Sequence, residues 1–158
     1  MAFNWWKLLH LIGLAGFLVS HGVSIFVLSR IRNVDLDRTK ILELISFSGL
    51  TTMPMYVSLG LLIVGGVGAG VAVGAFWQLW LTASIAILLA TIGLMIAIAS
   101  PYFKQIAAAC EVRPSGVPRK SDEELDALLH SSKGALVNII ESVGLLSILY
   151  LMIFKPWL

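Results

Sequence analysis

Long apolar stretches constrain this chain more than any other feature of its sequence. Four of them run from about residue 5 to 28, 50 to 73, 77 to 100 and 135 to 154. A helix of roughly 20 apolar residues crosses the hydrocarbon core of a bilayer, and it satisfies its own backbone polar groups there. The sequence therefore predicts an all-α fold, an integral membrane four-helix bundle that forms a single domain over residues 1–158.

The composition agrees with a protein whose main partner is the lipid bilayer. Hydrophobic residues make up 58% of the chain and charged residues 13%, whereas soluble domains are about half apolar and about a quarter charged. A single cysteine, Cys110, excludes an intrachain disulfide and any CxxC motif. The first apolar stretch lacks a small-residue cleavage site, so we expect it to remain as a membrane span.

The positions of the basic residues predict the orientation. They cluster in two of the three connections between the spans, whereas the connection at residues 66–76 carries no charge. Short basic loops stay in the cytoplasm, so we expect residues 101–132 to form a cytoplasmic loop. Both termini then lie on the outer side, together with an aromatic belt of Trp5, Trp6, Trp77, Trp80 and Trp157.

Two short polar segments have local signals of their own. Residues 41–49 read as helical turns at the interface that bend into the second span near Pro54. Within the 101–132 loop, Ser121 and Glu124 have the spacing of a capping box at the start of a short amphipathic helix. We expect the leucines of that helix to lie on the membrane surface or against the bundle.

Three ionisable residues lie inside the predicted spans: His10, His21 and Glu141. Such groups are costly in lipid and are functional candidates for that reason. With a rise of about 1.5 Å per residue, His21 and Glu141 lie at one level, roughly 12–13 Å above the cytoplasmic ends of their spans. We expect them to form a buried polar pair, either as a hydrogen bond that fixes packing or as part of a redox or proton-relay site. A polar layer surrounds this level, comprising Ser20, Ser24, Asn138, Ser142 and Glu43.

His10 and His21 could also be haem ligands. Eleven residues separate them, which places them on one helix face, roughly 16 Å apart. One helix supplies a ligand to each of two haems in this way in diheme cytochromes. Only His130 remains as a further histidine, so a bis-histidine diheme is excluded within one chain, whereas a single haem b is not.

Copper is a further alternative. Met53 and Met55 offer two thioethers, which suit Cu(I), and His21 could complete the site. Methionine is also common filler in apolar helices, and that interpretation is the stronger one. The sequence contains no serine–histidine–aspartate set and no phosphate-binding loop. It gives no support for nucleic-acid binding, because topology already explains where the basic residues lie.

The ends of the chain resemble a known group of proteins. The opening WWKLLHLIGLAGFLVSHG and the closing SILYLMIFKPWL resemble small four-helix bacterial membrane proteins. This group contains CopD-type copper-resistance domains, HemJ-type protoporphyrinogen oxidases and a related branch of unknown function, which the chain resembles most. The resemblance implies a haem-binding role for His10. The HemJ-type enzymes carry a histidine or lysine feature at the start of span three, where this chain reads WQLWLTASIAILL, which argues against the oxidase activity.

Three functions remain open from the sequence. The first is redox or electron transfer in the membrane through haem b. The second is a non-catalytic accessory subunit of a larger membrane complex, with other subunits or a second copy as partner. The third is the handling of copper or a small solute through the His21–Glu141 layer and the methionine pair. Whether the chain is an enzyme is left open.

Overall fold

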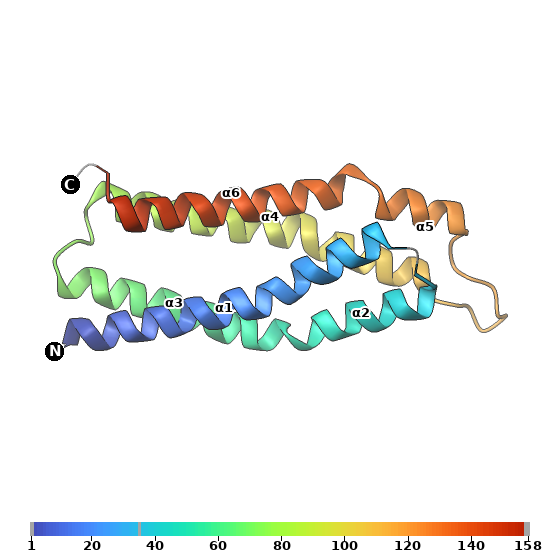
Figure 1. The fold of residues 1–158 in the computed structure, drawn as a ribbon, viewed down its shortest axis with the longest axis horizontal. Coiled ribbons are helices and arrows are strands. Elements are labelled where there is room, and N and C mark those ends of the chain that lie inside the picture. Colours follow the sequence, from blue (N-terminus) through green and yellow to red (C-terminus); the bar gives the residue numbers. More distant parts are fainter. Residues whose placement is uncertain (1, 35, 157–158) are drawn as a thin grey trace.

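The computed structural model describes residues 2–34 and 36–156, and these form an all-helical structure. In chain order, the helices are α1 (Ala2–Asn33), α2 (Arg38–Leu50), α3 (Thr52–Ala72), α4 (Leu79–Cys110), α5 (Asp122–Leu129) and α6 (Ser132–Phe154). Four segments are long and apolar enough to cross a membrane: α1, α2 with α3, α4, and α5 with α6. The expected four-helix membrane bundle is thus present (Figure 1).

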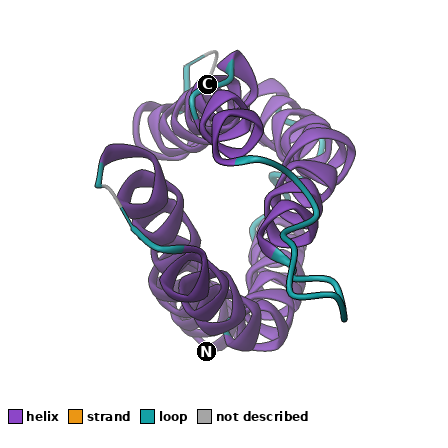
Figure 2. Ribbon diagram, turned by 90° about the vertical axis from the view of Figure 1, so that its right-hand side faces the viewer, coloured by secondary structure: helices purple, strands orange, loops and turns teal. Residues whose placement is uncertain are grey.

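The bundle consists of two antiparallel helix pairs. α1 packs along α3, and α4 packs along α6, while the first and last described residues lie at the same end (Figure 1). The pairs meet mainly at the opposite end, where α2 contacts both α1 and α4. In the view from that end, the helices are arranged in an elongated ring (Figure 2). We call this the α2/α5 end and the other the terminal end.

Glycines allow α1 and α3 to approach closely. A Cβ atom at Gly13 would collide with the backbone of Leu62, and one at Gly65 would collide with the backbone of His10. Small residues are a common means of packing helices in membranes, where van der Waals contact replaces the hydrophobic effect. The backbones of α1 and α3 are therefore in close contact in the half of the pair nearer the terminal end.

The second span follows a break in the helix rather than a smooth bend. α2 ends at Leu50 and α3 begins at Thr52. Pro54 is then the third residue of α3, in the first turn, where the missing N–H of proline breaks no intrahelical hydrogen bond. Thr51 takes up part of the change, because its Oγ1 donates to the carbonyl oxygen of Ser48 at 2.8 Å.

The third span extends further than the predicted limit at residue 100. α4 continues through Pro101 to Cys110, so the first part of the expected 101–132 loop is helical. The extra turns bury Tyr102, Ile106 and Ala109, each at most 1% exposed. Their spacing of three to four residues keeps one apolar face against the neighbouring helices. Tertiary packing thus overrides the helix-ending signal of the proline.

The short helix α5 begins as expected. Ser121 Oγ accepts a hydrogen bond from the backbone of Glu124, and the Glu124 carboxylate accepts one from the backbone of Ser121. This confirms the capping box. Leu125 and Leu129 are buried, so α5 packs against the bundle and does not expose these leucines on the membrane surface.

The main apolar core lies at the α2/α5 end. It contains residues from all helices except α3: Val27, Leu28, Ile31, Ile41, Ala99, Tyr102, Ile106, Ala109, Cys110, Leu125, Leu129 and Val137. Elsewhere, large apolar side chains face outward. The accessible surface is 9596 Å², whereas a soluble monomer of 17.1 kDa would have about 7,700 Å². The total surface thus exceeds that of a compact soluble protein, and the outward-facing apolar side chains are what contact with lipid requires.

The tryptophans form only part of the expected belt. Trp5 and Trp77 are 70% and 86% exposed, but Trp80 is 8% exposed. Trp80 packs with Ala75 and Leu81, and its Nε1 donates to Gln78 Oε1 at 2.6 Å. Its ring also lies under the Lys155 ammonium, 5.4 Å away. Trp80 therefore packs inside the α3–α4 turn and does not face the membrane interface. Trp157 lies outside the described residues.

Candidate functional site

The structure brings His21 and Glu141 together across the bundle. His21 Nε2, on α1, lies 3.4 Å from Glu141 Oε1, on α6. The two side chains are 16% and 8% exposed. No other ionic contact joins α1 to α6 among the described residues, so this pair is the polar link between the two halves of the bundle at this level.

The ring of His21 is held on its other side by an aromatic neighbour. Phe17, one turn earlier on α1, stacks on the imidazole with ring centroids 5.1 Å apart and an interplanar angle of 15°. Stacking of this kind fixes the orientation of the imidazole plane. His21 therefore presents Nε2 to Glu141 as a result of local structure on its own helix.

Two oxygen atoms on α6 next to this pair have no hydrogen-bond partner. They are Glu141 Oε2 and Asn138 Oδ1, and both are buried. Their residues lie three positions apart and hence on one face of the helix. On the same helix, Gly144 lies against Thr91 of α4, which keeps the α6 backbone close to its partner helix at this depth.

A hydroxyl pair extends the polar layer from α1 to α2. Ser24 and Ser48 lie with their Oγ atoms 2.9 Å apart, and Ser48 and Ser20 are each 8% exposed. Ser142 and Glu43, which the sequence also placed at this level, are exposed. Ser48 was not predicted as a member of the layer; its signal in the sequence is a serine at helical spacing within the apolar face of residues 41–49.

His10 has a different environment from that of His21. Its Nδ1 lies 2.7 Å from the carbonyl oxygen of Leu62 on α3, and its ring lies over Gly66. Because a carbonyl oxygen can only accept, Nδ1 carries the hydrogen, and Nε2 of the neutral ring keeps its lone pair. Metal-ligating histidines usually have this arrangement, with the second ring nitrogen donating to a carbonyl or carboxylate.

The two histidines do not share a neighbour, although the sequence places them on one helix face. α1 lies beside α3 in its first half and reaches the α4–α6 side in its second half (Figure 1). His10 therefore meets α3, and His21 meets α6. No cluster of three or more histidine, cysteine or acidic side chains suited to a metal ion occurs in the part of the chain that the structure describes.

The methionine pair does not converge on one point. Met53 and Met55 are two residues apart on α3, so their side chains project about 200° apart around the helix axis. Met53 is 71% exposed. The structure therefore does not bring the two thioethers and His21 together as a three-ligand copper site.

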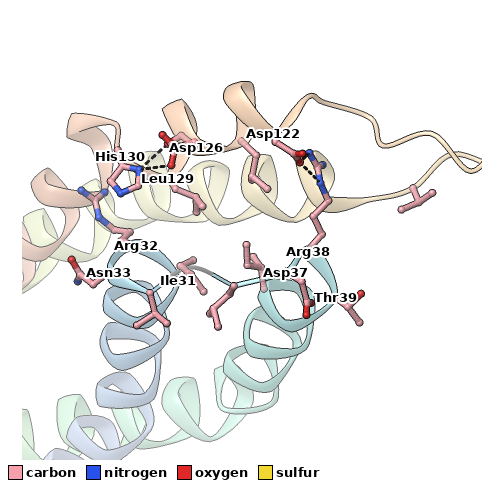
Figure 3. Close-up of a pocket in the computed structure, with 15 residues that line it drawn as sticks. Ile31, Arg32, Asn33, Asp37, Arg38, Thr39, Asp122, Asp126, Leu129 and His130 are labelled. Carbon is pink, nitrogen blue, oxygen red and sulfur yellow. Dashed lines mark hydrogen bonds and ion pairs between the residues drawn. The ribbon is translucent and has the colours of Figure 1, made fainter.

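A pocket opens at the α2/α5 end, and its polar side chains are largely bonded to one another (Figure 3). Arg38 is the centre of this network. Its guanidinium donates to Asp122 Oδ1 at 2.6 Å and to the carbonyl oxygens of Ala109 and Lys120, each at 2.8 Å. One side chain thus ties the start of α2 to the end of α4, the following connection and the start of α5.

Arg32 makes a similar link within the bundle. Its Nη1 donates to the carbonyl oxygen of Ser131 at 3.1 Å and to the hydroxyl of Tyr102 at 3.3 Å. Gly134 leaves the space that this guanidinium fills. The pocket is lined by the carboxylates of Asp37, Asp122 and Asp126 together with Arg32, Arg38 and His130. Because the bonds of the two arginines run between elements, they hold the α2/α5 end together.

No protein-family model, no curated protein and no solved structure matches the sequence.

Proposed function

We propose that the protein is a multi-pass protein of the bacterial inner membrane that holds a single haem b through His10 and serves electron transfer in the membrane. The proposal includes kinship with the CopD-type and HemJ-type proteins, on the resemblance of the chain ends. A haem at this position would supply a one-electron couple. The oxidase reaction is not part of the proposal, because span three lacks the polar feature of those enzymes.

The observation that carries the proposal is the hydrogen bond between His10 Nδ1 and the Leu62 carbonyl oxygen. It assigns the proton of the ring to Nδ1 and leaves Nε2 as an unprotonated donor atom for iron. His21 fits a ligand role less well, because its Nε2 faces Glu141. The donor set of one chain thus suits a haem with one histidine ligand.

The absorption spectrum of the full chain, purified in mild detergent after expression with ample haem, tests this function. We expect a Soret band and, after reduction with dithionite, α and β bands. His10→Ala should abolish them, while His130→Ala, which changes an exposed histidine between α5 and α6, should leave them unchanged. A band lost in His21→Ala but retained in His10→Ala would move the ligand to His21.

A visible spectrum without bands would overturn the haem proposal in favour of an accessory subunit. One observation supports that second function: the outward faces of the spans are broadly apolar, and the two helix pairs have few contacts outside the α2/α5 end. Such a bundle has surface to offer to a larger membrane complex. Co-purification with stoichiometric membrane partners, and no cofactor, is the result expected of an accessory subunit.

A further inference from the structure

The unpartnered oxygens on α6 indicate a ligand that the haem proposal does not involve. Glu141 Oε2 and Asn138 Oδ1 are both acceptors, both buried, and both without a donor. Glu141 as a whole is 92% shielded, at 8% exposure. Buried polar groups in proteins are almost always satisfied, and in lipid no bulk water is at hand to do so. Something that supplies hydrogen must therefore occupy this position.

We propose that Glu141, Asn138 and His21 form an intramembrane proton-binding site, in which one exchangeable proton is held on Glu141 Oε2 and bonded to Asn138 Oδ1. The two residues lie on one face of α6, so the protonated carboxyl can donate to the amide oxygen. The other carboxyl oxygen, Oε1, lies 3.4 Å from His21 Nε2. A single proton then gives both unpartnered oxygens a hydrogen bond.

The surroundings favour a proton over a metal ion. The described residues hold no cluster of three histidine, cysteine or acidic side chains, and Glu141 is the only acidic residue in the apolar stretches 50–100 and 134–154. The helices packed around it add few ionisable groups: His10 and His21 within residues 8–29 of α1, none in residues 79–101 of α4, and Lys133 and Tyr150 on α6 itself. With no fixed charge nearby, the neutral carboxylic acid suits the membrane interior.

The site binds and releases one proton at Glu141 Oε2. With the proton bound, Glu141 is a neutral acid. Release of the proton to solvent leaves a carboxylate whose Oε1 lies 3.4 Å from His21 Nε2. The site can therefore take up and give out one proton, and it does so whether or not the chain binds haem.

Infrared spectroscopy of the full-length protein tests the proposal directly. We expect the purified protein at neutral pH to show the C=O stretching band of a protonated carboxyl, shifted to lower wavenumber in D₂O. The other acidic side chains lie outside the apolar stretches. Glu141→Gln should remove the band. Glu43→Gln, which changes an exposed carboxylate on α2, should retain it.

A second variant keeps the test decisive if Glu141→Gln does not fold. Asn138→Leu removes the oxygen that accepts the proton but keeps the carboxyl, so the band should persist at a shifted wavenumber. An absent carboxylic acid band in the wild-type protein at neutral pH, or a band unchanged by both substitutions on α6, would overturn the proposal. Neither readout depends on haem content, so failure of the proton-site proposal is distinguishable from failure of the haem proposal.

Discussion

His10 and His21 show how much the role of a residue depends on what its ring nitrogens contact. His10 donates to a backbone carbonyl on α3, whereas His21 faces a carboxyl on α6 and stacks on Phe17. The first arrangement leaves a lone pair available, and the second places a titratable group beside another. We therefore assign different chemistry to two residues that the sequence presents as equivalent.

The His21–Glu141 pair should show strong energetic coupling. His21→Leu leaves the Glu141 carboxyl without its partner, so we expect a loss of about 1–3 kcal/mol in the free energy of unfolding. The double variant His21→Leu/Glu141→Leu should lose less than His21→Leu alone, because an apolar pair of similar size removes the need for a partner. A double-mutant cycle measures the coupling, from the unfolding in detergent of the wild-type protein, the two single variants His21→Leu and Glu141→Leu, and the double variant. Additive effects would contradict the pairing.

At the scale of the element, the close approach of α1 and α3 depends on individual glycines. Gly13→Ala would push a methyl group into the backbone of Leu62, which cannot rotate away. We expect a loss of about 1–3 kcal/mol, the usual range for overpacking. Gly22→Ala is the matched control on the same helix, because nothing lies within 4 Å of its added carbon. Equal thermal stability of the two variants would be evidence against the α1–α3 contact.

The start of α2 should depend on pH through Asp37. Its carboxylate accepts a hydrogen bond from the backbone N–H of Lys40 at 2.8 Å, and this bond lowers the pKa of Asp37 below its usual range. A lowered pKa in the folded state means that the stabilisation is full above the unfolded pKa of about 3.9. It is lost as the pH falls through the folded value.

Amide hydrogen exchange of the first turn of α2 checks this dependence. Protection should fall on acidification through the titration of Asp37 in the wild-type protein. Asp37→Asn keeps an oxygen that can cap the helix but does not titrate, so its protection should lack this acid-dependent loss. The same pH profile in both proteins would assign the change to another group.

The sequence predicted the existence of the elements more reliably than their ends. The apolar runs and the Ser121–Glu124 capping box are local signals, and the structure contains the corresponding helices. The extension of α4 to Cys110 is not local. It depends on Tyr102, Ile106 and Ala109 packing against other helices, which a window of sequence does not contain.

At the scale of the whole molecule, the arrangement of basic residues predicts which side each end occupies. With both termini outside, alkaline phosphatase fused after the last residue should be active, and green fluorescent protein at the same position should be dark. The reverse pattern is expected for insertions after Gly116, in the exposed turn before α5. A fluorescent C-terminal fusion would show that the protein has the opposite orientation.

The candidate site was predictable only in part at this scale. Depth along two spans is a matter of counting residues, so the level shared by His21 and Glu141 follows from the sequence. Which neighbour each side chain meets depends on how α1 crosses from α3 to the α4–α6 side (Figure 1). That crossing separates His10 from His21, and no periodicity along a single helix encodes it.

The division into two helix pairs has a consequence for biosynthesis. Gly13, Gly16, Gly65, Gly66 and Gly68 pack α1 against α3, both in the first half of the chain, so the close contacts of this hairpin can form before α4 leaves the ribosome. Glu141 belongs to the last span, and it meets His21 only after that span has been inserted. Chains that stall or are truncated before α6 would thus carry an assembled first hairpin with an unpaired histidine. Membrane quality control could recognise that exposed imidazole as the mark of an unfinished protein.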